Sequence, residues 1–261
     1  MSDVVPPAIT ALAPEPIPAM PEPDWTRVAA IPITESGEQL VPTSLMPRPV
    51  LTYPAYARQG VAGAHQECLV RREVAARLLQ AARSLPDGLN LVVLDGWRPW
   101  AVQTQLFEAY RDVLRHRHPD WSDDELLART REFVSLPSTD PAAPSPHLTG
   151  GAVDVTLCGP DGVWLDMGTA FDATVPASHT AYFEPGQPGA EQSGSEVFRA
   201  RRRILFNAMR NAGFTNLPTE WWHFDYGNQL WAWHGGHPQA CYGPAPMGGS
   251  VPLVLPFTIP G

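Results

Sequence analysis

The sequence contains no lysine, and all 18 residues counted as Lys or Arg are arginine. Schiff-base enzymes, P-loop nucleotide hydrolases and serine–lysine hydrolases depend on a lysine amine, so these three classes are excluded. The formal net charge is -9, which argues against nucleic acid as a partner, because its phosphates bind clustered cations. The one dense basic run, Arg199–Arg203, begins a helical pattern and is interpreted as a solvated helix face.

Cysteines and long apolar runs are also scarce. The three cysteines, Cys68, Cys158 and Cys241, form no CxxC motif and leave one unpaired in any disulfide scheme, which favours a reduced, intracellular protein. No stretch approaches the roughly 20 apolar residues of a membrane span, and residues 1–24 lack the cationic start and apolar core of a secretory signal. We therefore expect a cytoplasmic protein without membrane insertion. The sequence predicts no oligomeric state.

Proline divides the chain into three parts. Residues 1–24 are rich in proline and are predicted to be an extended or largely disordered lead-in. Residues 25–240 carry the periodic patterns of a folded domain. Residues 241–261 form a tail that is rich in proline and glycine and carries an apolar string at 251–257, which could pack along the body as an extended strap.

Helix-like and strand-like patterns alternate within the domain. Apolar residues recur at helical spacing over 70–85, and the apolar run at 89–94 suits a buried strand. A turn at 95–99 then precedes a second helical pattern over 102–113. The later expected elements are a helix opened by the capping box at 122–125, a strand at 152–157 with a hairpin return at 163–165, a polar surface excursion at 173–195, a helix at 197–212 and a strand-like run at 221–224. The fold class expected from this order is α+β, not a regular parallel βαβ array.

The first chemical candidate is the segment SPHLTGGAVD at 145–154. His147 precedes the expected strand, and strand alternation places Asp154 on the face opposite to Val153 and Val155. A carboxylate between two buried valines needs a partner, because an unpaired buried charge is costly. The small neighbouring residues leave space for a ligand to approach, so the pattern favours a metal ion.

A third metal ligand follows in the segment EWWH at 220–223. His147, Asp154 and His223 form a set typical of catalytic zinc, which takes three protein ligands and keeps a fourth position for water. Glu220 would take a proton from that water, and the two intervening tryptophans would raise its proton affinity. Positions i and i+3 of a strand face opposite ways, so both side chains can converge only if the backbone at 218–220 is irregular.

A purely structural alternative stays open at this point. An Asp–His pair inside an aromatic core, together with a buried Glu220 ion-paired to Arg98, would use the same residues without a metal. The motifs HExxH, GxSxG and GxGxxG are absent, so helix-based zinc proteases, α/β-hydrolases and dinucleotide-binding enzymes lose their main support.

Four motifs, in this order, resemble those of the VanX-type D-alanyl-D-alanine dipeptidases. The motif D-G-[YW]-R-P occurs at 95–99, S-x-H-x-x-G-x-A-x-D at 145–154, M-G-x-x-F-D at 167–172 and E-x-x-H at 220–223. The resemblance extends over roughly residues 49–233. These enzymes are zinc peptidases that share a fold with D,D-carboxypeptidases and the hedgehog signalling domain, which implies a small, mostly antiparallel sheet flanked by helices.

The resemblance also implies the roles of individual residues. One zinc ion per chain would be held by His147, Asp154 and His223. Glu220 would act as general base and acid, and Arg98 would stabilise the oxyanion, because a guanidinium is always charged and offers fixed donors.

Substrate contacts are implied as well. Ser145 would meet the substrate carboxylate, Asp172 would meet its free ammonium group, and a tyrosine near the start of the domain would complete the pocket. Tyr53 and Tyr56 are the two candidates for that tyrosine.

The predicted function is therefore hydrolysis of D-Ala-D-Ala or a closely related small D-dipeptide. A zinc D,D-carboxypeptidase acting on peptidoglycan stem peptides is the first alternative, with the same chemistry in an open groove. A non-catalytic zinc-containing binding module is an alternative of another class. The presence of Glu220 and Arg98 disfavours it, because neither is needed merely to hold a metal.

Overall fold

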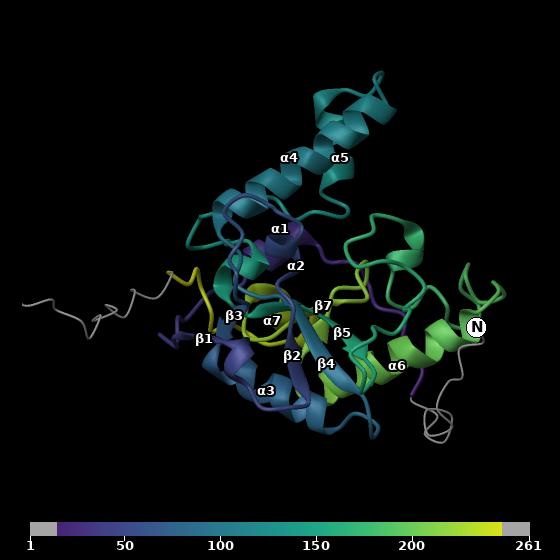
Figure 1. Cartoon of the computed structure of the whole chain (residues 1–261). Coiled ribbons are helices and arrows are strands. Elements are labelled where there is room, and N and C mark those ends of the chain that lie inside the picture. The colour runs from purple at the N-terminus through teal and green to yellow at the C-terminus, as the bar shows by residue number, and fades with distance from the viewer. Residues whose placement is uncertain (1–14, 247–261) are drawn as a thin grey trace, which may run out of the picture.

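A five-stranded sheet forms the centre of the protein in the computed structural model, which describes residues 15–246 (Figure 1). The strands, in their order across the sheet, are β2 (Val50–Thr52), β4 (Asn90–Asp95), β5 (Ala152–Cys158), β7 (His223–Asp225) and β6 (Thr215–Asn216). β2 and β4 are parallel, and the other three pairings are antiparallel. The predicted α+β class with a mostly antiparallel sheet is confirmed. The apolar string at 251–257 lies outside the described residues.

Strand β5 lies in the middle of the sheet, and all of its residues are buried. Val153, Val155 and Leu157 point into the main apolar core. Asp154 therefore points to the opposite face, because successive side chains of a strand alternate. The alternation expected from the sequence is confirmed, and it gives the sheet one apolar face and one face that carries polar groups.

Two long helices cover the apolar face. α3 (Arg72–Arg83) and α6 (Ser195–Asn211) contact each other on this side of the sheet (Figure 1), and they match the helices predicted at 70–85 and 197–212. Leu78 of α3 and Met209 of α6 are completely shielded from water. Burial of such side chains is the main favourable contribution to folding, at roughly 1.5–3 kcal/mol each.

A helical hairpin projects from the body (Figure 1). It consists of α4 (Trp100–Arg117) and α5 (Asp123–Thr130), and the Ser122 hydroxyl accepts a hydrogen bond from the Glu125 amide at 3.2 Å, as the capping pattern predicts. One face of α4 overlooks the polar side of the sheet. The hairpin thus forms a wall over the part of the protein where the candidate site lies.

The remaining elements are short. The expected return strand at 163–165 is reduced to one bridge between Cys158 and Trp164. β1 and β3 form a separate two-stranded sheet. The short elements are α1 (Trp25–Ala29), β1 (Leu40–Pro42), η1 (Thr43–Leu45), α2 (Ala55–Arg58), β3 (Leu69–Arg71), η2 (Pro146–Thr149), η3 (Pro176–Ser178) and α7 (Gln229–Gly235).

Arginines of α6 fasten the 173–195 excursion to the body. The Arg202 side chain is 1% exposed and donates to the carbonyl oxygens of Met167, Ala177 and His179, each at 2.8 Å. Arg203 forms an ion pair with Glu184. The interpretation of the arginine run as a solvated face is therefore wrong, because these side chains replace water as donors to buried loop carbonyls.

The described part of the proline-rich lead-in, residues 15–24, is extended and lies against the body. Ile17 is 4% exposed, and its amide donates to the Glu184 carboxylate at 3.1 Å. The Asn207 amide donates to the carbonyl oxygen of Glu15 at 2.8 Å. Within residues 15–246, no helix combines the length and apolar character needed to cross a bilayer.

We expect Arg202→Met to lower the free energy of unfolding by about 3 kcal/mol, because three buried carbonyl oxygens lose their donors. Arg201→Met is the matched control, since Arg201 lies on the more open side of α6 and donates to one carbonyl, that of Asp166. It should cost about 1 kcal/mol or less. Urea denaturation of both variants measures the difference, and equal small losses would contradict the role assigned to Arg202.

Candidate active site

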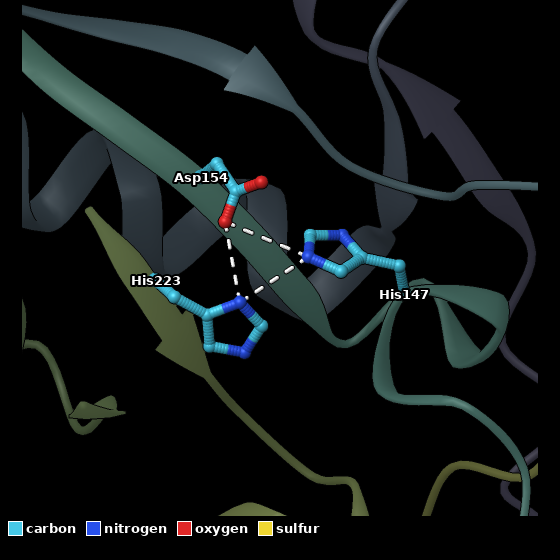
Figure 2. A group of neighbouring side chains, drawn as sticks. All are labelled: His147, Asp154 and His223. Atoms are coloured by element: carbon cyan, nitrogen blue, oxygen red, sulfur yellow. Dashed lines mark hydrogen bonds and ion pairs between the residues drawn. The ribbon is translucent and has the colours of Figure 1, made fainter. Parts of the chain in front are cut away.

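Three side chains from distant parts of the chain meet on the polar face of the sheet (Figure 2). The Asp154 Oδ1 atom lies 3.5 Å from His147 Nε2 and 3.2 Å from His223 Nδ1. The two ring nitrogens are 3.2 Å apart. All three residues are buried. The sequence prediction that these residues converge is matched by the geometry.

The strand register creates this meeting point. β5 and β7 pair so that Asp154 lies directly opposite His223, while Asp95 of β4 lies opposite Asp154 on the other side. His147 arrives from the short helix η2, which ends at Gly150 with φ +70. This left-handed conformation, which favours glycine, turns the chain from η2 into β5.

Each imidazole is oriented by an acceptor on its far side. His147 Nδ1 donates a hydrogen bond to the Gly96 carbonyl at 2.8 Å. Nε2 is then unprotonated, and its lone pair faces Asp154 and is available to a metal ion. His223 Nε2 donates to Asp225 Oδ2 at 3.1 Å, which leaves Nδ1 facing the same point. Such outer hydrogen bonds are typical of metal-ligating histidines.

The donor set fits a tetrahedral metal ion. A zinc ion bonded at about 2.0–2.1 Å would separate its ligand atoms by about 3.3 Å, close to the observed spacings. Asp154 Oδ1 is buried and accepts no hydrogen bond. The other oxygen, Oδ2, pairs with Arg98 at 3.3 Å, which favours the charged form of the carboxyl, so the orphaned Oδ1 carries charge. A cation would satisfy it.

Glu220 stands beside the three ligands because the backbone before β7 is a turn. The Glu220 amide donates to Leu217, and the His223 amide donates to Glu220 at 3.3 Å, so the strand begins only at His223. This irregularity was predicted, and it places Glu220 Oε2 3.8 Å from His223 Nδ1. Burial raises the pKa of Glu220 to about 8, against the opposing effect of His223.

Arg98 is held rigidly by four partners on the other side of Asp154. Its Nε donates to Asp95 and its Nη1 donates to Gln103, both at 2.8 Å, whereas Nη2 makes only long contacts, at 3.3 Å to Asp154 and 3.4 Å to the Tyr56 hydroxyl. The alternative of a Glu220–Arg98 ion pair is therefore wrong, since the carboxylates paired with Arg98 are Asp95 and Asp154.

The site opens into a cavity of about 310 Å³. The ligands, Glu220 and Arg98 form its inner end, and one face of α4 from Gln103 to Arg117 forms a wall. A smaller hollow of about 180 Å³ lies on the other side of the segment 133–135, and Glu220 borders both. The catalytic carboxylate candidate is thus accessible from two sides.

Two of the predicted substrate-binding residues line the main cavity. Tyr56 is buried beside Arg98, with the guanidinium carbon 4.7 Å from the ring centre. Asp172 adopts φ +63, the one positive φ at a non-glycine position among residues 15–246. Desolvation raises the pKa of Asp172 to about 6 against the opposing effect of Arg98, although part of the residue is exposed at the cavity.

The other two predicted contacts lie elsewhere. Tyr53 is 40% exposed and packs edge-on against Trp164, outside the cavity. Ser145 lines a neighbouring hollow, where its hydroxyl donates to Leu136 at 3.0 Å and accepts from the Ser138 amide at 2.8 Å. The structure thus brings Tyr56 and Asp172, but not Tyr53 or Ser145, to the metal ligands.

Sequence reasoning missed Asp225 and Gln103. Asp225 is fully buried, orients His223 and accepts a hydrogen bond from Asn228 at 2.6 Å. Its position two residues after His223 on a strand is a usable signal, because i and i+2 share a face. Gln103 bridges Arg98 to the Ser135 carbonyl, and no local pattern indicates that role.

The Peptidase_M15 family profile, described as D-ala-D-ala dipeptidase, matches residues 56–240. The chain belongs to this dipeptidase family. The resemblance predicted from the four motifs is therefore confirmed.

Two D-alanyl-D-alanine dipeptidases agree with the family assignment. A D-alanyl-D-alanine dipeptidase of Synechocystis sp. is 32% identical over 232 residues, which cover 82% of this chain and 94% of that protein. One from Escherichia coli is 31% identical over 160 residues, 60% of this chain and 66% of that protein. The zinc-bound D,D-pentapeptidase VanY is 18% identical, with TM-score 0.37 over 67% of this chain and 83% of that one.

For this dipeptidase-family chain, we expect Asp225→Asn to weaken zinc binding by about 10–100-fold. The amide keeps the size of the side chain but removes the charge that orients the His223 ring. Competition with a chelating dye measures the affinity. Asp112→Asn, on the exposed hairpin, is the control, and an unchanged affinity in Asp225→Asn would show that the outer hydrogen bond does not tune the site.

Proposed function

We propose that the protein is a zinc-dependent dipeptidase that hydrolyses D-Ala-D-Ala or a closely related D-dipeptide. The observation that carries the proposal is the buried triangle of His147, Asp154 and His223, with a carboxylate on one side and a fixed guanidinium on the other. One zinc ion per chain is proposed, because a neutral–anionic–neutral set of nitrogen and oxygen donors suits zinc. When bound, zinc lowers the pKa of a water molecule and polarises the substrate carbonyl.

Glu220 is proposed to move the proton. A group that accepts a proton from the attacking water and returns it to the leaving amine needs a pKa near the working pH. Burial already raises the pKa of Glu220 to about 8, and a bound dication would bring it back toward neutrality. Its position beside His223 gives it access to the water side of the site.

Arg98 is proposed to stabilise the negative oxygen that develops on the attacked carbonyl. Its Nε and Nη1 are committed to Asp95 and Gln103, which fixes the plane of the guanidinium. Nη2 makes only long contacts and faces the cavity, so it can offer a donor without prior reorganisation. The neighbouring anions keep Arg98 protonated despite its burial.

Substrate recognition is proposed to use Asp172 and Tyr56. An ionised Asp172 would pair with the free ammonium group of the dipeptide, and Tyr56 lines the same cavity, with its hydroxyl 3.4 Å from Arg98 Nη2. This arrangement would favour substrates with a free amino terminus, since a bound substrate would displace water from Asp172, and a desolvated carboxylate without a partner is costly.

A D,D-carboxypeptidase acting on peptidoglycan stem peptides is the second candidate. One observation favours it: the cavity continues along α4 through Leu106, Tyr110 and Val113 to Arg117. Arg117 lies 14 positions after Gln103 in α4, so the two residues are about 21 Å apart along the helix, well beyond the length of a dipeptide. We also propose a cytoplasmic location, because Cys68, Cys158 and Cys241 are all free thiols.

We expect Glu220→Gln to keep one zinc ion per chain and to lose at least about 100-fold in kcat, because the amide cannot accept the proton. Metal analysis and a D-alanine release assay measure the two quantities on one sample. His147→Ala is the comparison, since it should lose both zinc and turnover. Full activity in Glu220→Gln would show that Glu220 is not the proton-transfer group, whereas absent turnover in the zinc-loaded wild-type protein would support the non-catalytic binding module.

Free D-Ala-D-Ala should be cleaved with a kcat/KM at least about 10-fold above that for a stem pentapeptide ending in D-Ala-D-Ala. The expected cause is Asp172, which would face a neutral amide in the longer substrate and remain unpaired. Parallel assays with and without chelator provide the measurement. Turnover of the pentapeptide alone would favour the D,D-carboxypeptidase.

A further inference from the structure

The C-terminal part of the described chain lies directly behind the candidate site. The Trp97 indole Nε1 donates to the carbonyl oxygen of Ala245 at 2.9 Å, and the Ala245 amide donates to the carbonyl oxygen of Leu148, also at 2.9 Å. Trp97 and Ala245 are 6% and 4% exposed. One residue of the C-terminal segment therefore joins two loops that are about 50 residues apart in the sequence.

These two loops carry the chemistry. Trp97 stands between Gly96, whose carbonyl orients the His147 ring, and Arg98, whose amide donates to the His147 carbonyl at 3.2 Å. Leu148 follows His147 directly. Two direct hydrogen bonds, from His147 Nδ1 to Gly96 and from the Arg98 amide to His147, already join the turn at 95–99 to the loop that carries His147. The Ala245 contacts add a second connection between the same turn and loop.

The local sequence is suited to a rigid link. Ala245 lies between Pro244 and Pro246, so its amide is the one backbone donor in this tripeptide. Prolines hold the chain extended before folding and reduce the entropy lost when the link forms. The Ala245 amide, the one donor of the tripeptide, is the group that bonds to the Leu148 carbonyl oxygen.

The C-terminal segment is also anchored at Gly243, two residues before Ala245. The buried Arg71 guanidinium donates to the carbonyl oxygens of Gly243 at 3.1 Å and Thr149 at 2.7 Å. The Gly243 amide donates to the Glu35 carboxylate at 2.7 Å. Arg71 therefore ties the C-terminal segment to the same loop that carries His147, through contacts that do not involve Trp97.

We propose that Trp97 is a positioning residue for the reaction and acts through Ala245, so that residues 243–246 form part of the active-site framework. Trp97 touches neither the metal ligands nor the cavity through its indole nitrogen. Its effect is to hold the Gly96 carbonyl and the Arg98 guanidinium in register with His147. The expected effect of Trp97 on kcat rests on the proposed function. The expected effect of Trp97 on zinc affinity rests on the geometry of the metal site alone.

The test compares Trp97→Phe with Trp231→Phe in the full chain. Both substitutions keep an aromatic ring and remove one indole donor from a backbone carbonyl, because Trp231 Nε1 donates to Gly213 at 3.1 Å, far from the cavity. Both should lower the melting temperature slightly. Trp97→Phe should also weaken zinc binding about 10-fold, as expected for loss of an outer contact, and lower kcat about 10-fold with little change in KM.

Ala245→Pro is the second variant. It removes the donor to Leu148 and sets the proline ring against that carbonyl oxygen, while the carbonyl of residue 245 remains the acceptor for Trp97. It should show the same pattern of weaker zinc binding and lower kcat as Trp97→Phe. This variant keeps the proposal testable if Trp97→Phe does not fold.

Two outcomes would overturn the proposal. Zinc affinity and kcat in Trp97→Phe that match those of Trp231→Phe would reduce Trp97 to an ordinary stabilising residue. Wild-type zinc affinity in a folded Ala245→Pro would exclude the link to Leu148. If the wild-type protein binds zinc but does not cleave D-Ala-D-Ala, the proposed function fails, whereas the zinc competition still decides the role of Trp97.

Discussion

The antiparallel pairing of β5 with β7 is the constraint on which the site depends. It sets Asp154 opposite His223, and the pairing of β5 with β4 places Asp95, the partner of Arg98, on the other side of Asp154. A slip of one residue would turn the Asp154 side chain into the apolar core and bring a valine to the polar face. The apolar packing of α3 and α6 against the other face therefore protects the metal geometry as well as the stability of the fold.

The local patterns of the sequence were sufficient for much of the fold and for the inner part of the site. Helical periodicity located α3 and α6, strand alternation gave the two faces of β5, and the i, i+3 spacing of Glu220 and His223 required the turn that precedes β7. These predictions succeed because each depends on neighbouring residues. The choice of Tyr56 over Tyr53, and the engagement of Ser145 by Leu136 and Ser138, depend on long-range packing that no local spacing records.

Arginine is used in this chain as a structural donor to backbone carbonyls. Arg71 and Arg202 are both nearly inaccessible to water, and each serves several carbonyl oxygens of irregular segments. The planar guanidinium, with five fixed N–H groups, suits this task better than the single ammonium group of lysine. The arginine run at 199–203 was therefore wrongly interpreted as an exposed helix face. The buried charge of Arg202 is compensated by backbone carbonyl oxygens, whose positions cannot be inferred from local sequence.

The segment 133–135 divides the space around Glu220 into two hollows. The smaller one, lined by Glu22, Arg131 and Thr219, stays beside Glu220 when substrate occupies the larger one. Water consumed in each turnover can then be replenished from behind the bound peptide. A hydrolase built in this way need not empty its substrate channel to refill its second reactant.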